Sequence, residues 1–174
     1  MSSNIKLIFF LLIFTKLLAD TAQSQIVYIN MEKLFKESMV GISLNKQISE
    51  INGLNEKNIK KLEEEIKSED ENINSQKNIL NEEELKKKIA KLNNKIKEYQ
   101  NLLKQNKDNL NKKKIEGTNA ILQTLKPILS EYSEKNSISM VLQKQNVVIG
   151  KKELDITKDI ILILNEKIKK IDIN

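Results

Sequence analysis

Carboxylates and lysines are the residues of this chain whose side chains could do chemistry. The 174-residue sequence contains no His and no Cys, which excludes imidazole general acid–base catalysis, thiolate nucleophiles and zinc sites built from those residues. Acidic residues cluster at positions 63–65 and 69–71. Neighbouring residues on a helix point in different directions, whereas a hard cation needs several oxygens at one point. We therefore predict no enzymatic activity, no bound metal and no cofactor.

Lysines cluster in one stretch near the middle of the chain, and every basic residue of the sequence is a lysine. Such a surface could attract acidic protein segments, anionic lipid headgroups or lipopolysaccharide. The alternative is a solvated helix face that pairs with a neighbouring acidic helix. No Arg or aromatic platform interleaves the lysines, so we predict no nucleic-acid partner. The predicted basic surface comprises Lys86, Lys87, Lys88, Lys91 and Lys95.

These side chains lie in a long stretch, residues 41–136, that is rich in Lys, Glu, Asn, Leu and Ile. Its apolar residues recur every seven positions, as in coiled-coil helices. The repeat is interrupted near Asn81, which can cap a new helix whose first turn carries three glutamates. We predict an antiparallel hairpin with an outgoing helix over 42–80 and a return helix over 85–135. The alternative is one continuous helix. The repeating residues are Ile59, Ile66, Ile73 and Leu80, then Ile89, Ile96, Leu103 and Leu110, with a second column at Leu85, Leu92 and Tyr99.

The two arms of the predicted hairpin carry opposite charge. Residues 56–84 have a net charge of −5 and residues 86–114 a net charge of +9. This favours the antiparallel arrangement, although exposed ion pairs add only about 0–1 kcal/mol each. One column of the outgoing helix turns polar towards the tip, so we expect the tip to open more easily than the base. Gly53, Gly117 and Pro127 are the hinge candidates, because each weakens a helix; simple tolerance is the alternative for the two glycines.

Residues 1–24 have the features of a secretory signal peptide. A lysine precedes an apolar run over 7–14 that is too short to span a bilayer, and small residues suited to cleavage follow. The alternative is a membrane anchor. Without Cys, a lipoprotein anchor is impossible and no disulfide can form.

Strands and short helices are predicted at both ends of the remaining chain. Residues 25–29 form an apolar β-branched run, typical of a buried strand. Asn30 can end this strand and cap a short helix over 31–37, which residues 38–41 separate from the long helix.

The sequence of the C-terminal part predicts two more strands, at 137–143 and 147–149, with a connection of hairpin length between them. Thr157 suits the N-cap of a last helix. That helix is apolar nearly all round, so we predict that it is buried.

We predict one body from residues 25–40 and 137–174, with the hairpin 41–136 inserted, which is an α+β fold. This body would expose too much apolar surface for a monomer, so we expect subunits to share a core. The alternative is a monomer whose last helix covers the sheet. The predicted shared core comprises Ile26, Val27, Tyr28, Ile29, Ile138, Met140, Leu142 and Val148.

Several of these segments resemble the Skp/OmpH family. Residues 25–38 resemble the family's opening strand and short helix ending in Ser, with Asn30 in place of the usual Asp. Residues 139–142 resemble its second strand, 147–150 its third and 154–157 the start of its last helix. The resemblance covers residues 25–174 in order.

This resemblance implies a β-rich trimerisation body with three helical tentacles that enclose a cavity. It also implies a periplasmic holdase chaperone, a homotrimer that binds unfolded outer-membrane proteins and prevents their aggregation. Two other functions stay open: a structural coiled-coil spacer, and a basic protein that binds nucleic acid or anionic surfaces non-specifically.

Overall fold

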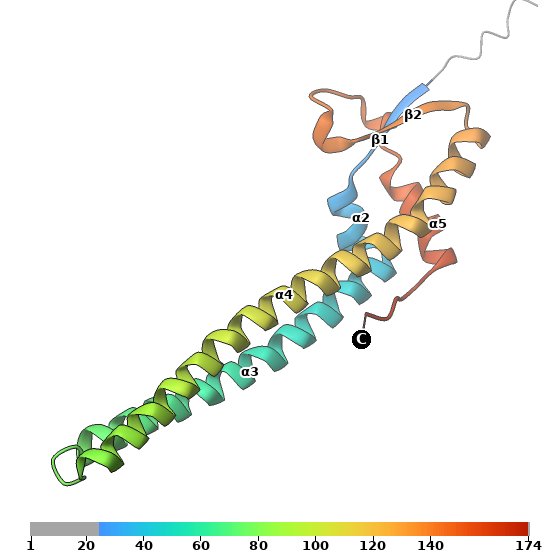
Figure 1. The fold of residues 1–174 in the computed structure, drawn as a ribbon. Coiled ribbons are helices and arrows are strands. Elements are labelled where there is room, and N and C mark those ends of the chain that lie inside the picture. The colour runs from blue at the N-terminus through green and yellow to red at the C-terminus, as the bar shows by residue number, and fades with distance from the viewer. Residues whose placement is uncertain (1–24, 174) are drawn as a thin grey trace, which may run out of the picture.

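The computed structural model describes residues 25–173, so the predicted signal peptide lies outside the described residues. A long two-helix hairpin projects from a small body in which the two ends of the chain meet (Figure 1). The elements in order are β1 (Gln25–Ile29), α2 (Met31–Glu37), α3 (Met39–Gln76), α4 (Glu82–Lys135), β2 (Ile138–Gln143), the 3₁₀ turns η1 (Lys144–Asn146) and η2 (Lys152–Leu154), and α5 (Thr157–Lys167).

The hairpin consists of α3 and α4, of 38 and 54 residues, lying side by side along their length (Figure 1). These lengths correspond to roughly 57 Å and 81 Å at 1.5 Å per residue. Asn81 caps α4 as predicted, because its side-chain oxygen accepts a hydrogen bond of 2.9 Å from the Glu84 amide. The predicted turn and antiparallel hairpin are therefore confirmed, and the continuous helix is excluded.

The ends of α3 differ from the prediction. The helix begins at Met39, because the buried Ser38 alone separates it from α2. The Ser38 amide donates to the Leu34 carbonyl, and its hydroxyl accepts from the Gly41 amide at 3.1 Å. At the other end, α3 stops at Gln76 rather than residue 80, since the Gln76 carbonyl accepts the amides of both residues 79 and 80 in a turn.

The two ends of the chain meet in a parallel sheet of β1 and β2, in which Ile26 pairs with Met140 and Ile29 with Gln143. The prediction of a third strand at 147–149 is wrong. The Ile156 amide donates to the Tyr28 carbonyl at 3.1 Å, so residues after the loop take the second edge of β1. Residues 147–149 instead lie in an irregular loop between the 3₁₀ turns η1 and η2.

The core lies where the sheet, the short helices and the base of the hairpin meet. Helix α5 packs against α2 and α4, and Tyr132 of α4 donates a hydrogen bond of 2.8 Å to Asp159 of α5. Burial raises the pKa of that tyrosine, and the carboxylate adds to the shift. The fully enclosed apolar side chains are Leu34, Val40, Ile121, Leu125, Ile160 and Leu164.

Two details of the last helix were predicted wrongly. Thr157 is its first residue and not its N-cap. The Thr157 hydroxyl accepts the Asn30 amide at 2.8 Å, while Asp155 accepts the Thr157 amide at 3.0 Å. The helix is also buried on one side only, because Leu162 is 64 % exposed.

Candidate functional site

The seam between α3 and α4 is apolar in part and polar in part. On α4, Leu92 is buried, and Leu85 and Tyr99 are half-buried. The other predicted column of α4 lies at the edge of the seam, where Ile89 is 42 % and Leu103 is 39 % exposed. We call this edge column the α4 stripe; it comprises Ile89, Ile96, Leu103 and Leu110.

The heptad pattern predicted that the residues of the α4 stripe would lie in the seam, but lysines one position earlier lie there instead. Lys88 and Lys95 lie three residues after Leu85 and Leu92, and both are half-buried. Lys88 donates to the Gln76 side chain at 3.0 Å. A lysine can lie in a seam because its aliphatic stem packs while its amine reaches a polar partner, and the heptad count of apolar residues missed this.

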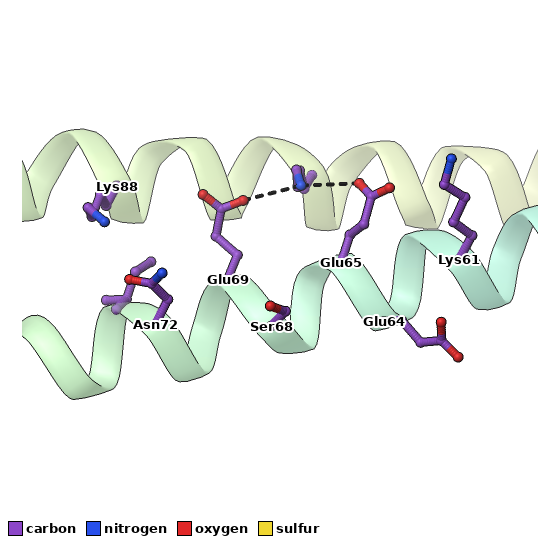
Figure 2. Close-up of a pocket in the computed structure, with 9 residues that line it drawn as sticks. Lys61, Glu64, Glu65, Ser68, Glu69, Asn72 and Lys88 are labelled. Carbon is purple, nitrogen blue, oxygen red and sulfur yellow. Dashed lines mark hydrogen bonds and ion pairs between the residues drawn. The ribbon is translucent and has the colours of Figure 1, made fainter.

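Lys95 of α4 connects the two helices of the hairpin through two glutamates of α3. Its Nζ lies 3.2 Å from Oε2 of Glu65 and 3.2 Å from Oε2 of Glu69, and Figure 2 shows both carboxylates turned toward the lysine between them. Lys91 lies 3.4 Å from the second Glu69 oxygen. The hydrogen bond from Lys95 is the main cause that lowers the pKa of Glu69, and the same contact raises the pKa of Lys95.

All five lysines of the predicted basic surface contact residues of the hairpin itself. Lys86 and Lys87 pair with Glu82 and Glu83 one turn earlier, at 2.6 and 2.7 Å, and Lys88, Lys91 and Lys95 have the partners given above. Only Lys91 and Lys95 pair with acidic residues of α3, as the alternative expected, whereas the other three bind within α4 or to a neutral glutamine. The lysine side chains at positions 86, 87 and 91 are nevertheless 68–74 % exposed, so a role in attracting anionic partners stays a prediction.

The predicted shared core divides into three groups by exposure. Val27 and Ile29 are each 2 % exposed and Tyr28 is 9 % exposed, so these three pack within their own chain. Ile138 and Leu142 are half-buried. Ile26 and Met140, which pair across the sheet, are each 51 % exposed, and Val148 is fully exposed beside Ile149 at 92 %.

The three hinge candidates have different surroundings. A side chain at Gly53 would meet nothing within 4 Å, whereas one at Gly117 would lie 2.4 Å from Leu44 Cδ1. Gly117 thus permits α3 and α4 to approach closely at the base. Pro127 lies inside α4, which continues past it to Lys135.

A segment that the sequence analysis overlooked lies against the base of the hairpin. After α5, residues 168–173 run back to α3 and α4 (Figure 1). Gln47 of α3 and Lys113 of α4 hold the backbone of this tail. Their side chains gave no signal in the sequence, because each is a common polar residue on a helix surface.

Other kinds of site are not found in the part of the chain that the structure describes. Within residues 25–173, no group of acidic side chains is arranged to hold a metal ion. No helix in that range is both long enough and apolar enough to cross a membrane.

Comparison with known proteins bears on this architecture. The sequence profile of the family described as "Outer membrane protein (OmpH-like)" matches residues 25–164. The chain belongs to the OmpH-like family.

A solved structure from Caulobacter crescentus CB15, described provisionally as an outer membrane chaperone (OmpH-like), superposes on the OmpH-like chain with a TM-score of 0.78. The two sequences are 15 % identical, and the match covers 86 % of this chain and 88 % of the other. A hairpin projecting from a small body is therefore the fold of both proteins. Among curated proteins, no sequence matches significantly.

Proposed function

We propose that this OmpH-like chain is a periplasmic chaperone that binds unfolded outer-membrane proteins and prevents their aggregation. Family membership supports the class of function, since OmpH-like proteins are chaperones and not enzymes. The observation that carries the proposal is the hairpin itself, a long arm with a partly polar seam and partly exposed apolar side chains along one edge.

The α4 stripe supplies the apolar contact surface in this proposal. Ile89 and Leu103 are 14 residues apart, about four helical turns, so they lie on the same helix face. Each exposes about two-fifths of its surface. A row of isolated apolar side chains, rather than one deep pocket, suits clients that share hydrophobicity but no common shape.

The arm should also adjust to clients of different size. Lys95, Glu65 and Glu69 replace apolar contacts in the distal seam. Ion pairs that water still reaches contribute less to stability than packed apolar side chains, so the distal part of the hairpin opens more easily than the base. A well-packed apolar seam up to the tip would instead suit a structural spacer.

In this proposal, three copies join through their bodies, and three arms enclose the client. Residues 25–40 and 137–174 form the body, and residues 41–136 form the arm. The exposed pair Ile26 and Met140 supports a contact between copies, together with the fully exposed Val148. Anionic lipid or lipopolysaccharide is a second partner class for the exposed lysines of the arm.

Aggregation measurements test the chaperone function. An unfolded outer-membrane β-barrel protein is diluted from urea with and without the OmpH-like chain, and light scattering is recorded. We expect suppression at stoichiometric amounts, reduced several-fold in an Ile89→Asp, Leu103→Asp double variant. The matched control, Asn94→Asp with Asn101→Asp, adds the same charge at two exposed positions of α4 and should suppress normally.

Different outcomes reject different parts of the proposal. Absence of suppression by the unaltered chain would reject the chaperone function. Equal suppression by both double variants would reject the α4 stripe as the contact surface. The assembly is tested by native mass spectrometry: we expect three times the chain mass, and a lower mass for Ile26→Asp with Met140→Asp.

A further inference from the structure

The C-terminal tail, residues 168–173, follows helix α5 and forms neither helix nor strand. Its first residue, Ile168, has extended backbone with φ −149° and ψ 130°. The tail then runs back to the base of the two long helices (Figure 1). The tail contacts α3 and α4 in a groove that we define by Leu44, Gln47, Lys113 and Gly117.

Gln47 and Lys113 bind the main chain of the tail. Gln47 donates from Nε2 to the Ile171 carbonyl at 2.7 Å and accepts the Ile173 amide at Oε1 at 3.3 Å. Lys113 donates to the Ile173 carbonyl. A side-chain amide that donates and accepts in this way acts on an extended segment as a neighbouring strand would. Main-chain contacts of this kind do not depend on the sequence of the bound segment.

One apolar side chain of the tail enters the groove. Ile173 is only 7 % exposed. A Cβ added at Gly117 would lie 3.1 Å from its Cγ2 and 2.4 Å from Leu44 Cδ1, so the glycine leaves the room in which the isoleucine packs. The groove thus holds main-chain atoms of the tail by hydrogen bonds and one apolar side chain by packing, the two kinds of contact that sites for extended peptides use.

We propose that this groove is a second peptide-binding site, and that the tail is its tethered occupant. This second site rests on the chaperone function proposed above. Its ligands are extended client segments in which apolar and polar residues alternate. The tail has this pattern, Ile171-Asp172-Ile173, as do the strands of membrane β-barrels. A client residue would replace Ile173, and the client backbone would take over the bonds to Gln47 and Lys113.

The tether sets the conditions under which a client can enter. A segment attached by a short linker competes with an effective concentration of about millimolar. A free peptide at micromolar concentration therefore displaces it poorly. A client already held between the arms has a comparably high local concentration, so exchange is restricted to captured clients.

Peptide binding to a shortened chain tests the proposal. The probe is a fluorescein-labelled peptide with the sequence of residues 168–174, and fluorescence anisotropy is measured with the full chain and with a chain ending at residue 167. We expect the shortened chain to bind at least about tenfold more tightly, because the tethered competitor is gone. An unrelated peptide of alternating Val and Thr should bind the shortened chain as well.

Two variants of the shortened chain show whether binding uses the groove. Gln47→Ala should weaken binding at least about tenfold, because both main-chain contacts made by this side chain are lost. Gln123→Ala, at an exposed glutamine of α4, should bind normally. Absence of binding by a folded shortened chain, or equal binding by the two variants, would overturn the proposal.

Hydrogen exchange of the intact chain decides the question if the shortened chain does not fold. Millimolar peptide should accelerate exchange of the Ile173 amide, which bonds to Gln47, and unchanged exchange would overturn the proposal. Neither peptide experiment involves an aggregating client, so the two proposals are tested separately. Suppression of aggregation without peptide binding would reject the groove as a peptide site and leave the chaperone function standing. Peptide binding without suppression of aggregation would reject the chaperone function.

Discussion

Lys95 and Glu69 face each other across the hairpin, with Nζ 3.2 Å from Oε2. Each group stabilises the charged form of the other, so the contact lowers the pKa of Glu69 and raises the pKa of Lys95. We therefore expect opening of the distal part of the hairpin to depend on pH.

The direction of that pH dependence follows from the two shifts. The Glu69 contribution is complete above its unfolded pKa of about 4.5 and is lost as pH falls through its lower folded value. The Lys95 contribution is complete below about 10.5 and is lost as pH rises through its higher folded value. We therefore expect the distal arm to open least between these limits and several-fold more often below pH 4. Hydrogen exchange of amides 62–98 measures this. Glu69→Gln should flatten the acid limb, and an unchanged acid limb would contradict the assignment.

Gly53→Ala and Gly117→Ala should change stability in opposite directions. A methyl group at position 53 meets nothing, so alanine should stabilise by about 1 kcal/mol through helix propensity. At position 117 the same gain is opposed, because the methyl group would press on Leu44 and Ile173 and overpacking costs about 1–3 kcal/mol; we expect a net loss of stability. Urea unfolding measures both.

The Gly53→Ala variant also tests the hinge. In the proposed trimer, spin labels at the tips of two hairpins give a distribution of distances, and Gly53→Ala should narrow that distribution if Gly53 is a hinge. An unaltered distribution would mean that the helix merely tolerates this glycine.

Asn106→Leu should stabilise the hairpin. The Asn106 Nδ2 atom is buried and has no hydrogen-bond partner, and such a group costs about 1–3 kcal/mol. The residue lies seven positions after Tyr99, in the same column of the seam. The urea midpoint should rise for Asn106→Leu and stay nearly constant for Asn101→Leu at an exposed position of the same helix. A lower midpoint would show that the asparagine has an unseen partner.

Ser38→Ala should destabilise the junction between α2 and α3. Ser38 is fully buried, and its hydroxyl accepts the Gly41 amide at 3.1 Å. Loss of such a cap costs about 0.5–2 kcal/mol. The control Ser130→Ala, at an exposed position inside α4, should change thermal stability little. Equal melting temperatures for the two variants would contradict the capping role.

Local signals in the sequence predicted much of the fold. Asn30 and Asn81 cap the helices that were expected to follow them, with bonds of 3.0 and 2.9 Å to the amides of residues 33 and 84. Such caps can be recognised because the capping side chain and its amide partner are three residues apart. The strands at 25–29 and near 138–143 were likewise evident from their β-branched residues.

Features that depend on distant contacts were missed. Residues 147–149 are as β-branched as a strand, yet they pair with neither β1 nor β2, and Ile156 rather than these residues bonds to the second edge of β1. Lys88 and Lys95 enter the seam through their aliphatic stems, which a count of apolar residues ignores. The tail groove depends on main-chain atoms, which no side-chain pattern reveals.

The parallel pairing of β1 with β2 has a consequence for how the protein matures. The two strands stand at opposite ends of the hairpin in the sequence, with Ile26 beside Met140. During synthesis, the first strand emerges long before its partner and stays unpaired until residues 138–143 follow. Helices α3 and α4 can pair first, because contacts between residues near in sequence form faster than distant ones. Their pairing reduces the length of flexible chain that must be closed before β1 and β2 meet. Completion of the arm thus precedes the sheet, and a chain interrupted before residue 138 would carry a finished arm and no base.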